Sequence, residues 1–338
     1  MKNVFSALLA ALMLVGILTG CTNQAEMPTV TATPAGSQAQ PTADEKICIV
    51  TTIFPEYDWV REILGDKADS AEITMLLDKG VDLHSYQPTA DYLIKLSDCD
   101  LFVYVGGESD GWVEDALKNA TNKNRKVINL LEILGDSVKE EETVEGMQAE
   151  EEDHEDHEEK EYDEHVWLSL KNAEVLVNAI SKSLQELDPD NKDTYAANAD
   201  AYVQKLSALD AEYQKAVSAG ACKTLLFGDR FPFRYLVDDY GLSYYAAFAG
   251  CSAESEASFE TVSFLGRKAD EGELPCVLTI EGKNHKIAET IVQNTAGKSQ
   301  KILTMDSMQS TTAQDVASGT TYLSLMEKNL DVLKEALG

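Results

Sequence analysis

The chain has 338 residues, with 59 Asp and Glu against 28 Lys and Arg, so its formal net charge is −31. This acidity argues against nucleic acid as a partner, because neutralising phosphates requires Lys and Arg, and it is compatible with cations. Five scattered cysteines follow Cys21 without a CxxC pair, so the sequence predicts neither a disulfide framework nor a zinc knuckle. The five are Cys48, Cys99, Cys222, Cys251 and Cys276. We expect most of them to be small core residues and at least one to be a free thiol, and the sequence leaves open whether two of them form a disulfide.

The N-terminus has the pattern of an export signal over residues 1–20. A single Lys precedes an apolar run that is short for a membrane span and that ends in small residues. The stretch LTGC resembles a bacterial lipobox, which implies that Cys21 becomes the lipidated first residue. Residues 21–45 are rich in Thr, Pro, Ala and Gln and predict a disordered tether. We therefore expect an exported protein, lipid-anchored to the outer face of the bacterial cytoplasmic membrane.

Residues 46–188 predict an N-terminal α/β lobe. Strand patterns alternate with helical patterns, and Thr89 is the expected N-cap of the second helix. Such alternation is typical of a parallel sheet covered on both faces. The predicted strands are 47–53, 72–77, 100–107 and 125–133, and the predicted helices are 55–65, 89–99 and 165–189.

Residues 189–221 predict one long linking helix, free of Pro and Gly over most of its length. Residues 222–338 then predict a C-terminal α/β lobe. Its expected strands are 223–229, 242–248, 275–282 and 301–307, and its expected helices are 233–241, 258–272, 285–297 and 321–338. The predicted fold class is α/β, with two lobes, each a mainly parallel sheet flanked by helices, joined by one long rigid helix. Binding sites in such sheets lie at the carboxyl ends of the strands, facing the cleft between the lobes.

An acidic loop, 136–164, interrupts the first lobe. It holds 16 Asp and Glu against two Lys, together with His154 and His157, and His165 follows it directly. We expect His165 to head an ordered helix, and His154 and His157 to lie in a mobile loop that collects metal weakly. The alternative interpretation of this loop is a charged segment that only increases solubility.

Three stretches, in their order along the chain, resemble the metal-binding solute receptors of bacterial zinc and manganese ABC transporters. They are HSYQPTADYLIKLSDCDLFVYVGG, then DEHVWLSLKNA after the acidic insert, and finally MDSM followed by GTTYLSLMEKNLDVLKEAL. The resemblance covers essentially everything from Lys46 to Gly338. In that family, four side chains from both lobes close around one cation in the interlobe cleft.

The resemblance implies a ligand set for this chain. His84 and His165 match the two ligands of the N-terminal lobe, and Asp306 matches an aspartate that follows a late strand. The remaining ligand, a histidine or glutamate in the family, aligns with Arg230, whose guanidinium cannot coordinate a cation. We therefore expect Asp229, one residue earlier, to take its place. The sequence leaves Glu281 and His285 as alternative ligands, and Glu254 and Glu256 as further candidates on a solvated loop.

The predicted function is capture of extracellular zinc by a monomeric receptor, which passes it to a membrane permease energised by a separate ATPase. Neutral imidazoles with carboxylates suit zinc, whereas two aspartates also suit manganese, so the sequence leaves the choice of metal open. A closed four-ligand site favours holding a metal over catalysis, and we expect no enzymatic activity. The competing hypotheses are a surface adhesin that uses the same fold and an exported metallohydrolase.

Overall fold

The structure, a computed structural model, describes residues 46–148, 161–252, 256–282 and 284–338. The predicted export signal, the tether with Cys21, and His154 and His157 of the acidic loop lie outside these residues, as does Glu254. No helix among the described residues combines the length and the apolar character needed to cross a membrane. All five described cysteines carry free thiols.

Four parallel strands form the first sheet, in the order β2-β1-β3-β4. The apolar runs of β1 and β3 are buried, as expected for the central strands of a sheet covered on both faces. Parallel neighbours require crossover connections, and short helices provide them. The strands are β1 (Ile47–Thr51), β2 (Ala71–Met75), β3 (Leu101–Tyr104) and β4 (Lys126–Asn129), and the helices are α1 (Phe54–Leu64), α2 (Ala90–Asp98), α3 (Val113–Lys118) and α4 (Leu130–Leu134).

The second sheet repeats this topology with four parallel strands in the order β6-β5-β7-β8. Its strands are β5 (Thr224–Phe231), β6 (Ser243–Ala249), β7 (Cys276–Ile280) and β8 (Lys301–Met305), and its helices are α7 (Arg234–Tyr240), α8 (Phe259–Glu271), α9 (Lys286–Asn294), α10 (Ala313–Ala317) and α11 (Tyr322–Leu337). The predicted fold class, two lobes with parallel sheets flanked by helices, is confirmed.

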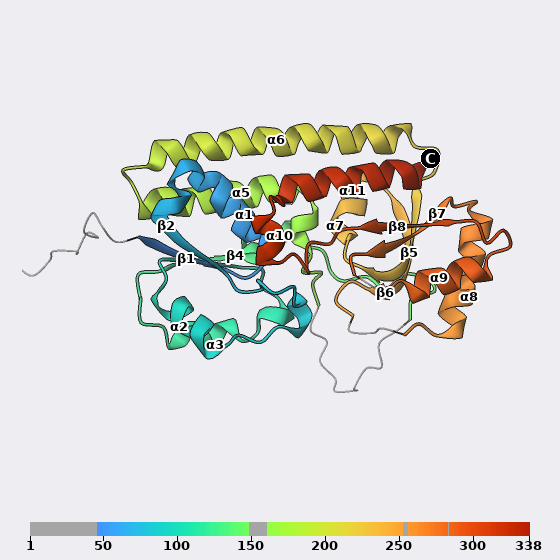
Figure 1. Ribbon diagram of the computed structural model, residues 1–338, viewed down its shortest axis with the longest axis horizontal. Coiled ribbons are helices and arrows are strands. Elements are labelled where there is room, and N and C mark those ends of the chain that lie inside the picture. Colours follow the sequence, from blue (N-terminus) through green and yellow to red (C-terminus); the bar gives the residue numbers. More distant parts are fainter. Residues whose placement is uncertain (1–45, 149–160, 253–255, 283) are drawn as a thin grey trace, which may run out of the picture. The chain divides into compact units, whose positions relative to one another are not determined.

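One long helix, α6 (Lys192–Ala219), runs along both lobes (Figure 1). It packs against α1 and α5 (Leu170–Leu187) of the first lobe and against α7 and α11 of the second. Its buried residues recur every three or four positions, which is the spacing of one helical face. They are Tyr195, Ala199, Tyr202, Leu206, Leu209, Tyr213 and Val217. A single stiff element therefore connects the two sheets.

Two local predictions were wrong, and both errors come from apolar runs. The segment 125–133, expected as one strand, ends as a strand at Asn129, whose side chain accepts a hydrogen bond from the Glu132 N–H and so starts α4. The helix expected from His165 begins instead at Leu170, capped by Ser169, after a 3₁₀ turn over Val166–Leu168. In contrast, Thr89 caps α2 as predicted.

Asp58 of α1 links the first lobe to the start of α11. Its carboxylate accepts a hydrogen bond from the backbone N–H of Tyr322 over 2.8 Å, and only 4% of the residue is exposed. Burial raises the pKa of Asp58 to about 6, although the Tyr322 hydrogen bond opposes this. A carboxyl group with a raised pKa in the folded state destabilises the protein as it ionises, so its cost appears as the pH rises from about 4 to above 6.

We therefore expect Asp58→Asn to flatten the pH dependence of stability. The amide oxygen keeps the hydrogen bond to Tyr322 and does not ionise, so the variant should gain up to about 3 kcal/mol relative to the parent between pH 4 and pH 7.5. Urea unfolding at both pH values measures this difference, with Asp66→Asn, at an exposed position, as the control. Parallel stability curves for the parent and Asp58→Asn would contradict the assignment.

Candidate metal centre

His84 lies in a 3₁₀ turn (Leu83–Ser85) that follows β2 of the first sheet. The turn begins at Asp82, whose carboxylate accepts a hydrogen bond from the His84 backbone N–H over 3.0 Å. On the ring, Nδ1 lies 2.8 Å from Ser109 Oγ and 3.4 Å from Glu164 Oε2. These oxygens hold the ring so that the opposite nitrogen, Nε2, faces His165.

His165 is fully buried and is held by Asp163 at two points. One carboxylate oxygen of Asp163 accepts hydrogen bonds from the His165 backbone N–H over 2.8 Å and from ring Nδ1 over 2.9 Å. A carboxylate accepts only, so the hydrogen on this ring must sit on Nδ1. The lone pair of Nε2 is then available on the side away from Asp163.

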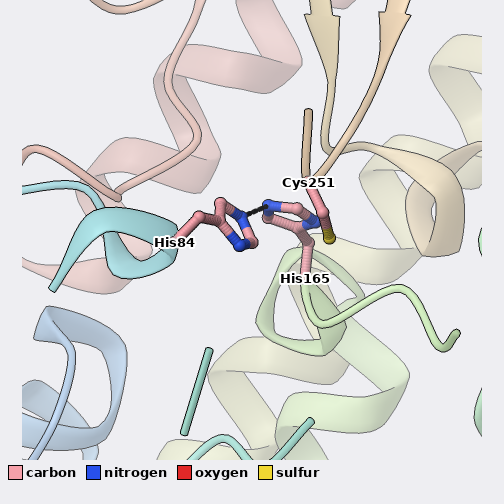
Figure 2. A group of neighbouring side chains, drawn as sticks. All are labelled: His84, His165 and Cys251. Carbon is pink, nitrogen blue, oxygen red and sulfur yellow. Dashed lines mark hydrogen bonds between the residues drawn. The ribbon is translucent and has the colours of Figure 1, made fainter. Parts of the chain in front are cut away.

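The two Nε2 atoms meet at 3.2 Å, as Figure 2 shows. Burial and the neighbouring His165 lower the pKa of His84 to about 3, whereas for His165 burial is outweighed by Asp163, which raises the pKa. The two Nε2 atoms are the ring nitrogens opposite those that contact Ser109 and Asp163. The geometry offers one place for a positive charge, between two imidazole nitrogens.

This spacing fits a tetrahedral zinc ion. Zn–N bonds of about 2.0–2.1 Å at a tetrahedral angle put two nitrogens about 3.3 Å apart. The observed 3.2 Å between the Nε2 atoms of His84 and His165 needs almost no adjustment. Each ring also has an oxygen on its other nitrogen, which is the usual outer partner of a metal-binding histidine.

A third potential ligand, Cys251, comes from the second lobe. Among the described residues, one group of three brings His, Cys, Asp or Glu ligand atoms within 4.8 Å of one another, and its members are His84, His165 and Cys251. Cys251 lies in the turn that follows β6 and is partly buried. It lines a cavity of about 270 Å³ together with His84 and Glu164.

Arg230 aligns with the remaining metal ligand of the family, and the structure shows what this side chain contacts instead. The register of β5 against β6 shifts between Phe227 and Arg230, and such a bulge redirects the side chains that follow it. The guanidinium forms an ion pair with Asp82, which lies in the first lobe, and donates to the Ser252 carbonyl over 3.3 Å. Arg230 therefore connects the two lobes beside the histidines.

Asp229 and Asp306 lie outside the group of three, and ligation by either stays a prediction. The carboxylate of Asp229 accepts hydrogen bonds from the backbone N–H groups of Arg230 and Ile280, over 2.9 and 3.3 Å. Asp306 accepts from the Met308 N–H over 2.8 Å, and burial, followed by the charge of Glu281, raises its pKa to about 7.

The alternative ligands also lie outside the group. Glu281 is engaged by the loop after β8, since its carboxylate accepts from Ser307 N–H, Ser307 Oγ and Gln309 N–H over 2.6–3.1 Å. His285 directly precedes α9, and its buried Nδ1 has no hydrogen bond from any described residue. Glu256 is exposed.

Sequence reasoning missed Cys251, Asp163 and Glu164 as parts of this region. Asp163 and Glu164 belong to the acidic run, yet they are only 2% and 3% exposed. Cys251 follows a strand of the second lobe, the same position that drew attention to Asp229, but was interpreted as a core residue. The strand-end rule, applied to every polar or sulfur side chain, would have found it.

The chain matches known proteins over nearly all of its described part. The model of the family described as "Zinc-uptake complex component A periplasmic" matches residues 49–336. The chain belongs to this family. The resemblance to metal-binding solute receptors of ABC transporters, inferred from the sequence, is thereby confirmed.

Two relatives and two solved structures support this membership. The zinc-binding lipoprotein AdcA of Streptococcus pneumoniae is 32% identical over 300 residues, 88% of this chain and 57% of that protein. The high-affinity zinc uptake system protein ZnuA of Bacillus subtilis is 32% identical, covering 87% of this chain and 88% of that protein. The Zn(II)-bound ZnuA-like domain of S. pneumoniae AdcA superposes with a TM-score of 0.67 at 31% identity, covering 87% of this chain and 99% of that domain. The metal-dependent lipoprotein YcdH of B. subtilis gives 0.69 at 27% identity, covering 86% and 99%.

The chain thus spans little more than half the length of AdcA, and nearly all of ZnuA. The similarity to a separate ZnuA-like domain of AdcA shows which part of the longer protein is shared.

Gly250 is the residue that permits the close approach of the Cys251 turn to His165. A Cβ at this position would lie 2.9 Å from the Phe231 carbonyl oxygen and 3.1 Å from His165 Cε1.

We expect Gly250→Ala to destabilise the protein by about 1–3 kcal/mol, the usual range for overpacking, and to displace the His165 ring. Chemical denaturation measures the first effect, and NMR signals of the His165 ring measure the second. The control is Gly297→Ala, where the added Cβ would approach only the side chain of Ser299; equal behaviour of the two variants would refute the packing argument.

Proposed function

We propose that this chain is the substrate-binding receptor of a metal ABC transporter, which captures zinc outside the cell and delivers it to the membrane permease. The observation that carries the proposal is the His84–His165 pair, with Nε2 atoms 3.2 Å apart and each Nδ1 held by an oxygen. Two lone-pair nitrogens fixed at this distance are prepared to bind a cation with little reorganisation.

Membership in the zinc-uptake family supports the transport role. The printed names of AdcA and ZnuA describe zinc binding and high-affinity zinc uptake for those proteins. We infer the same cargo here, with binding and release as the activity rather than catalysis. Imidazole is a good ligand for zinc and a poorer one for manganese, which prefers oxygen, so the pair favours zinc.

We further propose that the chain is anchored by a lipid on Cys21 and acts as a monomer. The LTGC motif and the Thr- and Pro-rich segment 21–45 support an anchor followed by a tether of about 25–30 Å. The tether would let the receptor reach a permease in the same membrane, and a separate ATPase would energise transport.

The central test is zinc binding by His84→Ala and His165→Ala. Each substitution removes an imidazole ligand, so each should weaken zinc binding at least tenfold, about 1.4 kcal/mol or more. Competition titration against a zinc chelator measures the affinity, and His285→Ala serves as the matched histidine control. If His285→Ala weakens binding more than the other two, the site lies at α9 instead.

A second test separates collecting zinc from holding it. His154 and His157 stand in the acidic loop, and we propose that they bind additional zinc weakly. The double variant His154→Ala/His157→Ala should keep the affinity of the first zinc within a few-fold and lose the weaker equivalents that follow it. Calorimetric titration resolves both, and a tenfold loss of the first equivalent would place one of these histidines in the main site.

A further inference from the structure

We propose that Cys251 supplies a thiolate as the third ligand, so that the second lobe closes a His₂Cys site on the captured ion. This inference rests on the proposed function, because it takes zinc binding by His84 and His165 as given. On binding, the thiol loses its proton to water as the Zn–S bond forms, so one proton is released from Cys251 for each zinc captured.

The distances are close to those of a zinc centre. Zn–S bonds of about 2.3 Å and Zn–N bonds of about 2.0–2.1 Å at a tetrahedral angle put sulfur and nitrogen about 3.6 Å apart. The ligand atoms of His84, His165 and Cys251 already lie within 4.8 Å of one another. A movement of about 1 Å by the largely buried turn after β6 would complete the geometry.

The cavity beside Cys251 gives an independent sign of a cation. Glu164 lines this cavity with His84 and Cys251, and its carboxylate is only 3% exposed. Its Oε2 accepts no hydrogen bond from any described residue, and His84 Nδ1 lies 3.4 Å away. A buried carboxylate oxygen without a donor is costly unless positive charge lies nearby. The same wall also carries other carboxylates: Glu108, Glu141 and Glu161.

Two contacts hold Cys251 where it can reach the histidines. Its backbone N–H donates to Glu141 over 2.9 Å, and the next carbonyl, of Ser252, accepts from Arg230. Because Arg230 also pairs with Asp82 at the start of the His84 turn, it links the cysteine turn to the histidine turn. Burial and the neighbouring carboxylates raise the pKa of the Cys251 thiol, so the charge of the bound ion would have to stabilise the thiolate. Arg230 therefore does not bind the ion, but it positions the turn after β6 that carries Cys251.

A thiolate ligand has a consequence for metal choice. Sulfur is a soft donor that favours zinc and copper(I), whereas manganese prefers carboxylate and water oxygens. Two imidazoles and one thiolate should therefore discriminate strongly against manganese. Two imidazoles with two aspartates would discriminate much less.

The test compares Cys251→Ser with Cys222→Ser, a matched control because Cys222 is also partly buried and lies at the start of the second lobe. Cobalt(II) replaces zinc as a spectroscopic probe, since a cobalt–thiolate bond gives an intense charge-transfer absorption in the near ultraviolet. We expect this band in the parent protein and in Cys222→Ser, and its loss in Cys251→Ser. Zinc affinity should fall at least tenfold in Cys251→Ser alone, and the preference for zinc over manganese should fall with it.

The outcomes separate this inference from the proposed function. Cobalt and zinc binding without the charge-transfer band, unchanged in Cys251→Ser, would overturn the thiolate ligand and leave the receptor function standing. Failure of the parent protein to bind either metal would overturn both.

A purely structural role for Cys251 would lower the melting temperature of the metal-free Cys251→Ser protein, whereas ligation predicts an unchanged metal-free melting temperature. Cys251→His should recover part of the zinc affinity, since it restores a ligand atom, and no recovery would count against ligation.

Discussion

The turn of the first lobe that carries His165 and Trp167 is held by hydrogen bonds from the second lobe, and the arrangement of the site depends on them. The indole N–H of Trp167 donates to the Ser307 carbonyl over 2.9 Å, and Tyr322 Oη donates to the Trp167 carbonyl over 2.6 Å. Both rings are fully buried, and Trp167 also packs against the imidazole of His165. Because Ser307 and Tyr322 follow the last strand of the second lobe, a histidine of the first lobe is positioned by contacts from the second.

The acidity of the chain has two different physical roles. Among the described residues of the acidic loop, most carboxylates are exposed, but Asp163 and Glu164 at its end are buried against the histidines. Tyr235 of α7 holds this end in place, donating to the Asp163 carbonyl over 2.8 Å. In a low-dielectric interior, a carboxylate beside an imidazole fixes which nitrogen carries the hydrogen. The exposed charges instead attract cations at long range, an effect that salt screens.

Arg230 shows how a site can change without a change of fold. The β-bulge before it and the absence of a side chain at Gly228, where a Cβ would lie 2.6 Å from Ala288 Cα, let α9 pack closely while redirecting the arginine toward Asp82. A guanidinium at this place cannot bind a cation, but it can join the lobes by an ion pair. That position carries a positive charge, whereas the β6 turn places the sulfur of Cys251 beside the two histidines.

The sequence by itself determined the two-lobe architecture and the two histidines. Periodicity marks buried parallel strands and the long helix α6, because burial of one face is a local property of spacing. His84 and His165 stand out through the motifs around them, and the structure brings their Nε2 atoms together. The sequence could not show that 125–133 changes from strand to helix at Asn129, since a short apolar run suits either element. Nor could the sequence predict that Cys251 lies beside residues 84 and 165. This proximity depends on a β-bulge, on Gly250 and on hydrogen bonds between segments far apart in the chain. Only the tertiary structure decided which polar side chains at the strand ends face one another, because contacts between the lobes are not encoded in any local pattern.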